Sequence, residues 1–197
     1  MSHRLFIAIV PPQEVQRAIG EAARAVQAAL GDGSARDIKW VPDENVHATL
    51  KFLGETDEAK IEPIQRAIEA IASDWQPFAI QPTGIGCFPN ERRPAVVWIG
   101  LTEGTDHLRR LADEVETEMD PLGFVPERKP YRGHLTIGRV RKDVRISGLA
   151  EALTAAGDAA ERIPEFQASE IALMKSVLDR GGAVYTRLSG AALNATR

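Results

Sequence analysis

Apolar residues recur along the chain with two different periods. Four stretches repeat an apolar residue every three or four positions, which is typical of a helix with one buried face. They cover residues 15–30, 61–71, 108–119 and 146–153. We predict helices over all four, the last of them short. Thr56 with Asp57, and Thr105 with Asp106, stand where the second and third helices begin, so their side-chain oxygens are predicted to cap those helices.

Seven further runs are apolar, mostly bounded by glycine or proline, and predict strands. They cover residues 5–10, 46–53, 78–85, 95–101, 134–140, 166–173 and 183–188. Residues 179–182, Asp-Arg-Gly-Gly, predict a hairpin turn between the last two strands. Residues 31–36 and 86–94 are rich in glycine, proline and charge and predict loops.

The order of these elements repeats once. An apolar strand, an amphipathic helix and a strand with the pattern His-apolar-Thr-apolar occur first at residues 5–50 and again at residues 95–137. Another helix and another strand follow each copy. This order indicates an internal duplication, and we predict an α+β fold of two lobes that face each other across a pseudo-two-fold axis. Both histidine strands would then border one central cleft.

Length, charge and cysteine content narrow the class of protein. With 197 residues, 44% of them hydrophobic, the chain can build one substantial core, and we predict one bilobal domain over residues 1–197. A net charge of -4 argues against a protein that coats duplex nucleic acid, although it leaves room for a local basic pocket. The single cysteine, Cys87, excludes an internal disulfide. No apolar run reaches the length of a membrane span, so we expect a cytoplasmic protein with no membrane contact.

The two His-x-Thr patterns hold the candidate chemistry. Alternate residues of a strand share a face, so His47 should stand beside Thr49, and His134 beside Thr136. The residues between and after them should turn to the buried face; these are Ala48, Leu50, Leu135 and Ile137. Two alternatives are half-buried histidines bonded to the backbone, and a metal site. No H-x-H, H-E-x-x-H or carboxylate cluster completes a metal site, so we expect no metal and no cofactor.

Two imidazoles and two hydroxyls across a cleft suit cleavage of a phosphodiester. One imidazole can take a proton from water while the other, as imidazolium, protonates the leaving oxygen. Threonine hydroxyls can donate hydrogen bonds to the phosphate oxygens that gain charge. Because the ordinary pKa of histidine is about 6.5, both forms are accessible near neutral pH, and a bell-shaped pH dependence is expected.

Positive charge is concentrated around the second pattern. Seven cations against Asp143 alone lie within eighteen residues: Arg128, Lys129, Arg132, Arg139, Arg141, Lys142 and Arg145. Such a segment in an acidic protein suggests a bound anion, and a solvated charged loop is the alternative for most of them. Arg139 is the candidate phosphate clamp. Strict alternation points it away from His134, so this role requires a β-bulge, for which Gly138 leaves room.

Several segments together resemble a known family. They are residues 4–9 (Arg-Leu-Phe-Ile-Ala-Ile), 45–54 (Asn-Val-His-Ala-Thr-Leu-Lys-Phe-Leu-Gly) and 134–139 (His-Leu-Thr-Ile-Gly-Arg). The chain resembles the 2H phosphoesterases, and within them the bacterial and archaeal RNA 2',3'-cyclic phosphodiesterases, also called 2'-5' RNA ligases. The resemblance covers nearly the whole chain. It implies an antiparallel sheet flanked by helices in each lobe, and hydrolysis of a 2',3'-cyclic phosphate to a 2'-phosphomonoester.

The resemblance also implies individual roles. His47 would be the general acid that protonates the 3'-oxygen, and His134 the general base on water. The groups that hold phosphate would be Thr49, Thr136 and Arg139. The chain departs from the family at Gly133, where the family usually has proline before the second histidine.

Other functions fit the same residues. One is a 2H phosphodiesterase that acts on a small cyclic phosphate or on a 2'-5' linkage, and another is a non-catalytic module that captures RNA 2'-phosphate or cyclic-phosphate ends. In each case the expected partner is an RNA end or a small nucleotide. We expect a monomer with no obligate protein partner.

Overall fold

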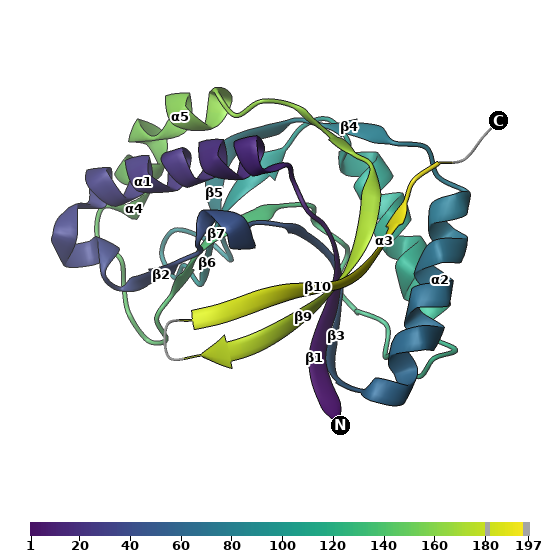
Figure 1. Cartoon of the computed structure of the whole chain (residues 1–197). Helices are drawn as coiled ribbons and strands as arrows, with labels where there is room; N and C mark the ends of the chain where they lie inside the picture. The colour runs from purple at the N-terminus through teal and green to yellow at the C-terminus, as the bar shows by residue number, and fades with distance from the viewer. Residues whose placement is uncertain (180–181, 195–197) are drawn as a thin grey trace.

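Two four-stranded antiparallel sheets form the centre of the molecule. The computed structural model describes residues 1–179 and 182–194 (Figure 1). The first sheet has the order β10-β9-β1-β3, with bounds β1 Ser2–Ile9, β3 Ala48–Asp57, β9 Glu170–Asp179 and β10 Gly182–Ala192. The second has the order β2-β7-β6-β5, with bounds β2 Ile38–Trp40, β5 Pro82–Phe88, β6 Val96–Leu101 and β7 Leu135–Val140. A small ribbon pairs β4, Phe78–Ile80, with β8, Phe166–Ala168.

In the described part of the chain, five α-helices flank these sheets. Their bounds are α1 Gln13–Ala35, α2 Ile61–Ser73, α3 Thr105–Met119, α4 Leu149–Ala155 and α5 Gly157–Glu161. Two short 3-10 helices, η1 Asp43–Asn45 and η2 Glu58–Lys60, precede β3 and α2. None of the helices within the described ranges is both long and apolar enough to cross a bilayer.

The two copies of the repeat exchange elements. Strands β1 and β3 pair in the first sheet, and their counterparts β6 and β7 pair in the second. However, α1, which follows β1, packs on β2 and β7 of the second sheet, while α3, which follows β6, packs on β3 of the first. Strand β2 of the first copy also pairs with β7. Figure 1 accordingly shows α1 with α4 and α5 on one side, and α2 with α3 on the other. The predicted bilobal α+β fold is confirmed, with helices exchanged between its lobes.

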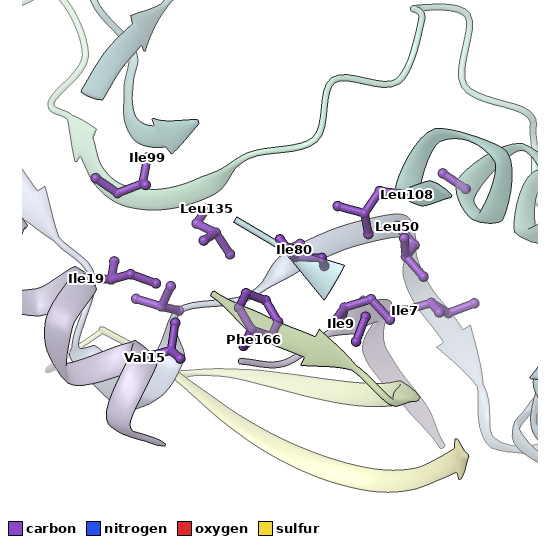
Figure 2. Packing of buried hydrophobic residues seen from close by; sticks show 14 of the residues in the cluster. Ile7, Ile9, Val15, Ile19, Leu50, Ile80, Ile99, Leu108, Leu135 and Phe166 are labelled. Carbon is purple, nitrogen blue, oxygen red and sulfur yellow. The ribbon is translucent and has the colours of Figure 1, made fainter. Parts of the chain in front are cut away.

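A continuous hydrophobic core joins the lobes. Ile7 and Ile9 of β1 belong to the same buried cluster as Ile99 of β6 and Leu135 of β7. Phe166 belongs to this cluster and is drawn among side chains of both sheets in Figure 2. Since alternate strand residues enter this core, the intervening residues of the same strands are left for the opposite face.

The predicted helices are found with shifted ends, and five of the seven predicted strands are found as single strands. The other two are each divided between two sheets: the strand predicted over residues 78–85 is β4 and β5, and that over 166–173 is β8 and β9. Helix α1 continues to Ala35 across a kink at Gly31, whose φ of 68° lies in the left-handed region, so the predicted loop is wrong over residues 31–35. Strand β5 extends to Phe88, which shortens the second predicted loop. Strand β2 and helix α5 were not predicted, because each is too short to show a period.

The cap predictions are correct at one position only. Asp57 accepts a hydrogen bond from the Ala59 N–H, although it caps η2 and not α2 itself. Thr56 instead donates to the Gly54 carbonyl. Gly104 is the N-cap of α3, and the Thr105 hydroxyl donates backward to the Leu101 carbonyl, so that cap prediction is wrong.

The predicted hairpin between the last two strands is present. Asp179 pairs with Gly182 where β9 ends and β10 begins. The two residues at the tip, 180–181, lie outside the described residues.

Candidate active site

The two patterned histidines occupy equivalent places in the two sheets. His47 immediately precedes β3, and His134 immediately precedes β7. The His47 Nδ1 lies 2.7 Å from the Asn45 carbonyl oxygen, and the His134 Nδ1 lies 2.7 Å from the Arg132 carbonyl oxygen. A carbonyl only accepts, so Nδ1 must carry the proton in each ring. Each neutral imidazole therefore keeps an unprotonated Nε2 that can take or return a proton.

Aromatic rings pack around both imidazoles. The His47 ring lies 4.6 Å from the ring of Phe6 and 5.2 Å from that of Tyr185, between centroids. The ring of Phe88 meets His134 edge to face at 5.2 Å. These contacts fix the ring planes and remove water from around them, so each imidazole is held before any substrate binds.

Burial shifts the pKa of both histidines downward. It lowers the pKa of His47 to about 4, against an opposing effect of the hydrogen bond to Asn45. The positive charges of Arg139 and His134 lower it further. Burial likewise lowers the pKa of His134, the hydrogen bond to Arg132 opposes this shift, and Arg139 adds to the lowering. In the protein without ligand, His47 is therefore neutral at pH 7, and the shift of the His134 pKa favours the neutral form of that ring.

Three of the groups selected from the sequence lie near enough for their charges to act on one another. Arg139 acts on both imidazoles, and His134 acts on His47. The structure thus brings together the two histidines and the arginine selected from the sequence, although the three residues come from opposite lobes.

A β-bulge turns Arg139 toward the cleft. Trp98 of β6 pairs with Thr136, but the preceding Val97 pairs with Gly138, so Ile137 is an extra residue in β7. The extra residue reverses the alternation, and Arg139 returns to the face of Thr136. The expected bulge is confirmed. Gly138 is needed there, since a Cβ would lie 2.7 Å from the Ile38 side chain.

The first motif contains the same bulge. Ala8 pairs with Thr49 and Ile7 pairs with Lys51, so Leu50 is the extra residue. Lys51 is consequently buried, and Phe52 takes the place that Arg139 has in the second motif. The Phe52 side chain is 63% exposed, with its ring centroid 6.2 Å from that of Phe6. Phe52 was not assigned from the sequence, and its position five residues after His47, matching Arg139, is the signal that could have found it.

The threonines occupy the half-buried side of their strands. Thr49 and Thr136 are both half-buried, as expected for residues that border a cleft. The four residues predicted to face the core are buried, with exposed fractions of 4% or less: Ala48, Leu50, Leu135 and Ile137. The predicted alternation is confirmed up to each bulge.

A cavity of about 810 Å³ lies beside His47. Its walls include Phe6, Asn45 and Tyr185, which contact His47, together with Phe52 and Arg139. Its charged lining residues are Arg4, Lys39, Glu44 and Arg139, so positive charge prevails. The basic pocket that the overall charge left possible is therefore present.

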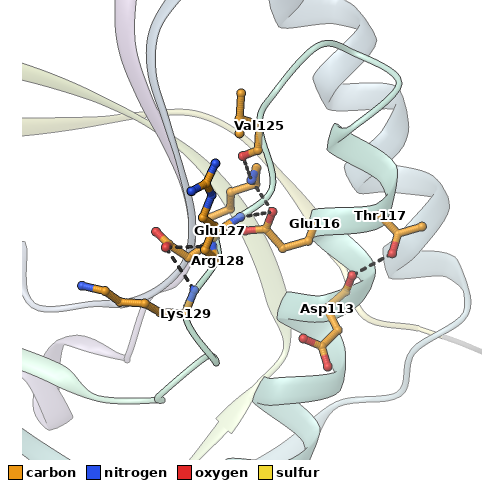
Figure 3. Close-up of polar contacts among 8 residues, drawn as sticks. Asp113, Glu116, Thr117, Val125, Glu127, Arg128 and Lys129 are labelled. Atoms are coloured by element: carbon orange, nitrogen blue, oxygen red, sulfur yellow. Dashed lines mark hydrogen bonds and ion pairs between the residues drawn. The ribbon is translucent and has the colours of Figure 1, made fainter.

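Part of the basic segment forms a braced loop before His134. In Figure 3 the backbone N–H groups of Arg128 and Lys129 donate to the Glu127 carboxylate. The Glu127 N–H donates to Glu116 of α3, whose carboxylate also binds the ammonium of Lys51 from β3. These contacts link the loop before His134 to β3, the strand that follows His47.

Metal-binding side chains are not clustered in the described part of the chain. Within it, no three residues of the types His, Cys, Asp and Glu stand close enough together to hold an ion. The lone thiol of Cys87 has a pKa raised by burial and by Glu91.

Comparison with known proteins identifies the family. The protein-family model described as "LigT like Phosphoesterase" matches the chain twice, over residues 9–98 and 99–185. The chain belongs to the LigT-like phosphoesterase family. Each match contains one His-x-Thr motif, which confirms the internal duplication and the resemblance to 2H phosphoesterases inferred from the sequence. This LigT-like chain is therefore an enzyme of the phosphoesterase class.

Relatives of this LigT-like phosphoesterase match it over most of its length. The RNA 2',3'-cyclic phosphodiesterase of Archaeoglobus fulgidus is 34% identical over 94% of this chain and 97% of that protein. The protein of the same name from Aeropyrum pernix is 36% identical over 77% of this chain and 84% of its own. A crystal structure from Thermus thermophilus has a TM-score of 0.77 at 28% identity and covers 98% of this chain and 100% of that one. Family and fold therefore agree.

Proposed function

We propose that this LigT-like phosphoesterase hydrolyses RNA 2',3'-cyclic phosphate ends to 2'-phosphomonoesters without a metal ion. The observation that carries the proposal is the matched pair of imidazoles, each with Nδ1 held by a carbonyl and Nε2 free. Relatives that match over nearly the whole chain are named RNA 2',3'-cyclic phosphodiesterases, which supports the same substrate.

The reaction needs one base and one acid. His134 Nε2 takes a proton from water as the water oxygen bonds to phosphorus. The bond between phosphorus and the 3'-oxygen breaks, and the His47 imidazolium gives its proton to that oxygen. The product has a 2'-phosphate and a 3'-hydroxyl. His134 gains one proton and His47 loses one, so the total number of protons on the two histidines does not change.

Substrate binding supplies the protonated acid. In the protein alone, burial and Arg139 keep the His47 pKa at about 4, so its imidazolium is scarce at pH 7. A phosphate anion beside the ring favours the imidazolium and raises this pKa. The negative charge of the bound phosphate is what keeps His47 protonated. Its proton is therefore readily donated when negative charge develops on the leaving oxygen.

The remaining groups hold the phosphate. The hydroxyls of Thr49 and Thr136 donate to its non-bridging oxygens, and Arg139 balances their negative charge. Thr49 belongs to one lobe, and Thr136 and Arg139 belong to the other, so the donors approach the phosphate from two sides. The same groups would catalyse a related transfer in which a 5'-hydroxyl replaces water. His134 would take the hydroxyl proton, the bond between phosphorus and the 3'-oxygen would break, His47 would protonate that oxygen, and a 2'-5' linkage would form.

The test is product analysis of a short RNA that ends in a 2',3'-cyclic phosphate, incubated with the protein in EDTA. We expect complete conversion to the 2'-phosphate. His47→Ala and His134→Ala should each lower the rate by roughly 10²–10⁴-fold, the usual contribution of a positioned acid or base. His107→Ala, on the exposed face of α3, is the matched control and should keep full activity.

Other outcomes separate the alternatives. Full activity in either site variant would remove that histidine from the mechanism. Loss of activity in EDTA, restored by a divalent ion, would replace the two-histidine mechanism with a metal-dependent one. Tight binding of the cyclic end without turnover would favour a capture module, while turnover only of small cyclic nucleotides would exclude RNA as the substrate.

A further inference from the structure

A buried glutamine lies near the start of α1. Gln16 is 7% exposed, and it is one of three buried polar or charged side chains in the described part of the chain. Val15 and Ile19 of the same helix point into the hydrophobic core (Figure 2). Burial of an amide costs free energy unless its groups are hydrogen-bonded, so the bonds that Gln16 makes are the important feature of this position.

The Gln16 amide holds the backbone before and after Asn45. Its Nε2 donates to the Val46 carbonyl at 3.1 Å and to the Glu44 carbonyl at 3.3 Å. The peptide group that carries the Asn45 carbonyl lies between these two held carbonyls in the chain. The Asn45 carbonyl is the acceptor for His47 Nδ1, at 2.7 Å. Gln16 is therefore linked to His47 through a single peptide group.

Helix α1 and η1 approach each other closely around this contact. Gly20, one turn after Gln16, has no room for a side chain, since a Cβ there would collide with the Asp43 carboxylate. Arg24 follows one turn later, and its guanidinium pairs with the same carboxylate at 3.1 Å. Residues four apart share a face of a helix, so η1 lies along one stripe of α1. The position of the Asn45 carbonyl is therefore set by α1.

The side chain of Asn45 fastens the same segment to a second element. Its Nδ2 donates to the Ala183 carbonyl of β10 at 2.8 Å. Tyr185, two residues further along β10, meets the His47 ring edge to face. Asn45 thus holds His47 with its carbonyl and, with its amide, holds the strand that packs on the same ring.

We propose that Gln16 and the side chain of Asn45 are positioning groups for the general acid. Together they fix the Asn45 peptide group, which keeps a proton on Nδ1 of His47 and directs Nε2 to the leaving oxygen. The hydrogen bond that another group makes to one ring nitrogen decides which nitrogen is left to react. The inference rests on the proposed function, in which His47 protonates the 3'-oxygen.

A displaced Asn45 carbonyl would weaken the acid in two ways. Its hydrogen bond raises the pKa of His47 against the effect of burial, so its loss would make the imidazolium scarcer. The neutral ring would also be free to place its proton on Nε2. Arg139 and His134, whose charges act on the same ring, would remain in place.

The first test measures the tautomer directly. In NMR spectra of the ring nitrogens at pH 7, His47 of the intact protein should be protonated on Nδ1. Gln16→Met keeps the length of the side chain but has no donor, so His47 should become a mixture of both tautomers. His134, whose acceptor is the Arg132 carbonyl, should keep its signals and is an internal reference. Gln27→Met, further along α1, is the matched control and should change neither ring.

The second test measures turnover of an RNA that ends in a 2',3'-cyclic phosphate. Gln16→Met should lower kcat about tenfold, the scale of one lost orienting hydrogen bond, with KM nearly unchanged. Asn45→Ala should act in the same direction, because it releases the same peptide group from β10. The double variant should lose less than the product of the two single losses, since both changes act on one carbonyl.

The outcomes separate this inference from the proposed function. A folded Gln16→Met protein that keeps His47 on the Nδ1 tautomer, or that changes KM alone, would overturn the role of Gln16. If Gln16→Met does not fold, Asn45→Ala decides by the same two measurements. If the intact protein does not cleave the RNA, the proposed function fails, while the NMR comparison still supports or overturns the link from Gln16 to His47.

Discussion

At the scale of single residues, the chemistry depends on where protons reside. Each patterned histidine donates its Nδ1 proton to the carbonyl two residues before it, and this local contact selects the tautomer. The carbonyls belong to Asn45, the last residue of η1, and to Arg132, so the backbone just before each strand sets the tautomer of the histidine that follows. Arg139 then acts on both rings through its charge.

Arg139 has a measurable influence on the histidines. Removing its positive charge in Arg139→Ala should favour the imidazolium, so the pKa of His47 should rise from about 4 and that of His134 should rise as well. Both should stay below 6.5, because burial remains. An NMR titration of the histidine ring protons would measure this, with Arg139→Lys as the charge-conserving control. An unchanged His47 midpoint in Arg139→Ala would show that the guanidinium does not act on the site.

At the scale of elements, two β-bulges decide which side chains of each motif face the cleft. Strict alternation from His47 would place Lys51 on the cleft face and Phe52 in the core. The extra residue Leu50 exchanges them, so Lys51 is buried and Phe52 is exposed. The equivalent bulge at Ile137 turns Arg139 to the cleft. The period of two predicted the first four residues of each motif correctly, and the bulges explain why it fails after them.

The buried Lys51 connects the His47 motif to the loop that precedes the His134 motif. Its side chain is 3% exposed, and its ammonium pairs with Glu116 and donates to the Val125 carbonyl. Lys51→Met should leave the Glu116 carboxylate without its cation, and we expect the free energy of unfolding to fall by about 3 kcal/mol. Denaturation by urea would measure the loss.

The control for Lys51 is the double variant. Lys51→Met with Glu116→Leu removes both charges and should recover part of the lost stability, because no uncompensated charge is left. If the single variant is as stable as the intact protein, or the double variant is no better than the single one, the ion pair does not brace this loop.

At the scale of the whole molecule, the exchange of helices makes the lobes interdependent. Helix α1 covers the sheet of the second copy and α3 covers that of the first, so neither copy encloses its own core. The buried residues of both sheets form one cluster. On this basis we propose that residues 1–197 unfold as one cooperative unit, in agreement with the single domain predicted from the sequence.

The shared core offers a test of cooperativity. Phe166 is 5% exposed within the common cluster, and Phe166→Ala should lower the free energy of unfolding by about 3–5 kcal/mol through the cavity it creates. The transition should stay single, with the same midpoint by far-UV circular dichroism and by tryptophan fluorescence. Val125→Ala at the surface, 83% exposed, should change stability by less than about 0.5 kcal/mol. Two separate transitions would contradict a cooperative unit.

The sequence by itself determined the local features of this protein. Apolar periodicity predicted the principal helices and strands, since a residue's neighbours three, four or two positions away share its face in any helix or strand. The repeated order of elements predicted the duplication, and the His-x-Thr spacing selected His47 and His134. These features depend on residues close together in the chain.

The tertiary structure decided the features that arise between distant segments. Strand β2 forms only because β7 supplies its hydrogen-bond partners, and the bulges at Leu50 and Ile137 are set by register against β1 and β6. Burial of the histidine rings, which lowers their pKa, needs aromatic residues from other strands. Pairing and burial depend on which surfaces meet in space, and local sequence patterns do not contain that information.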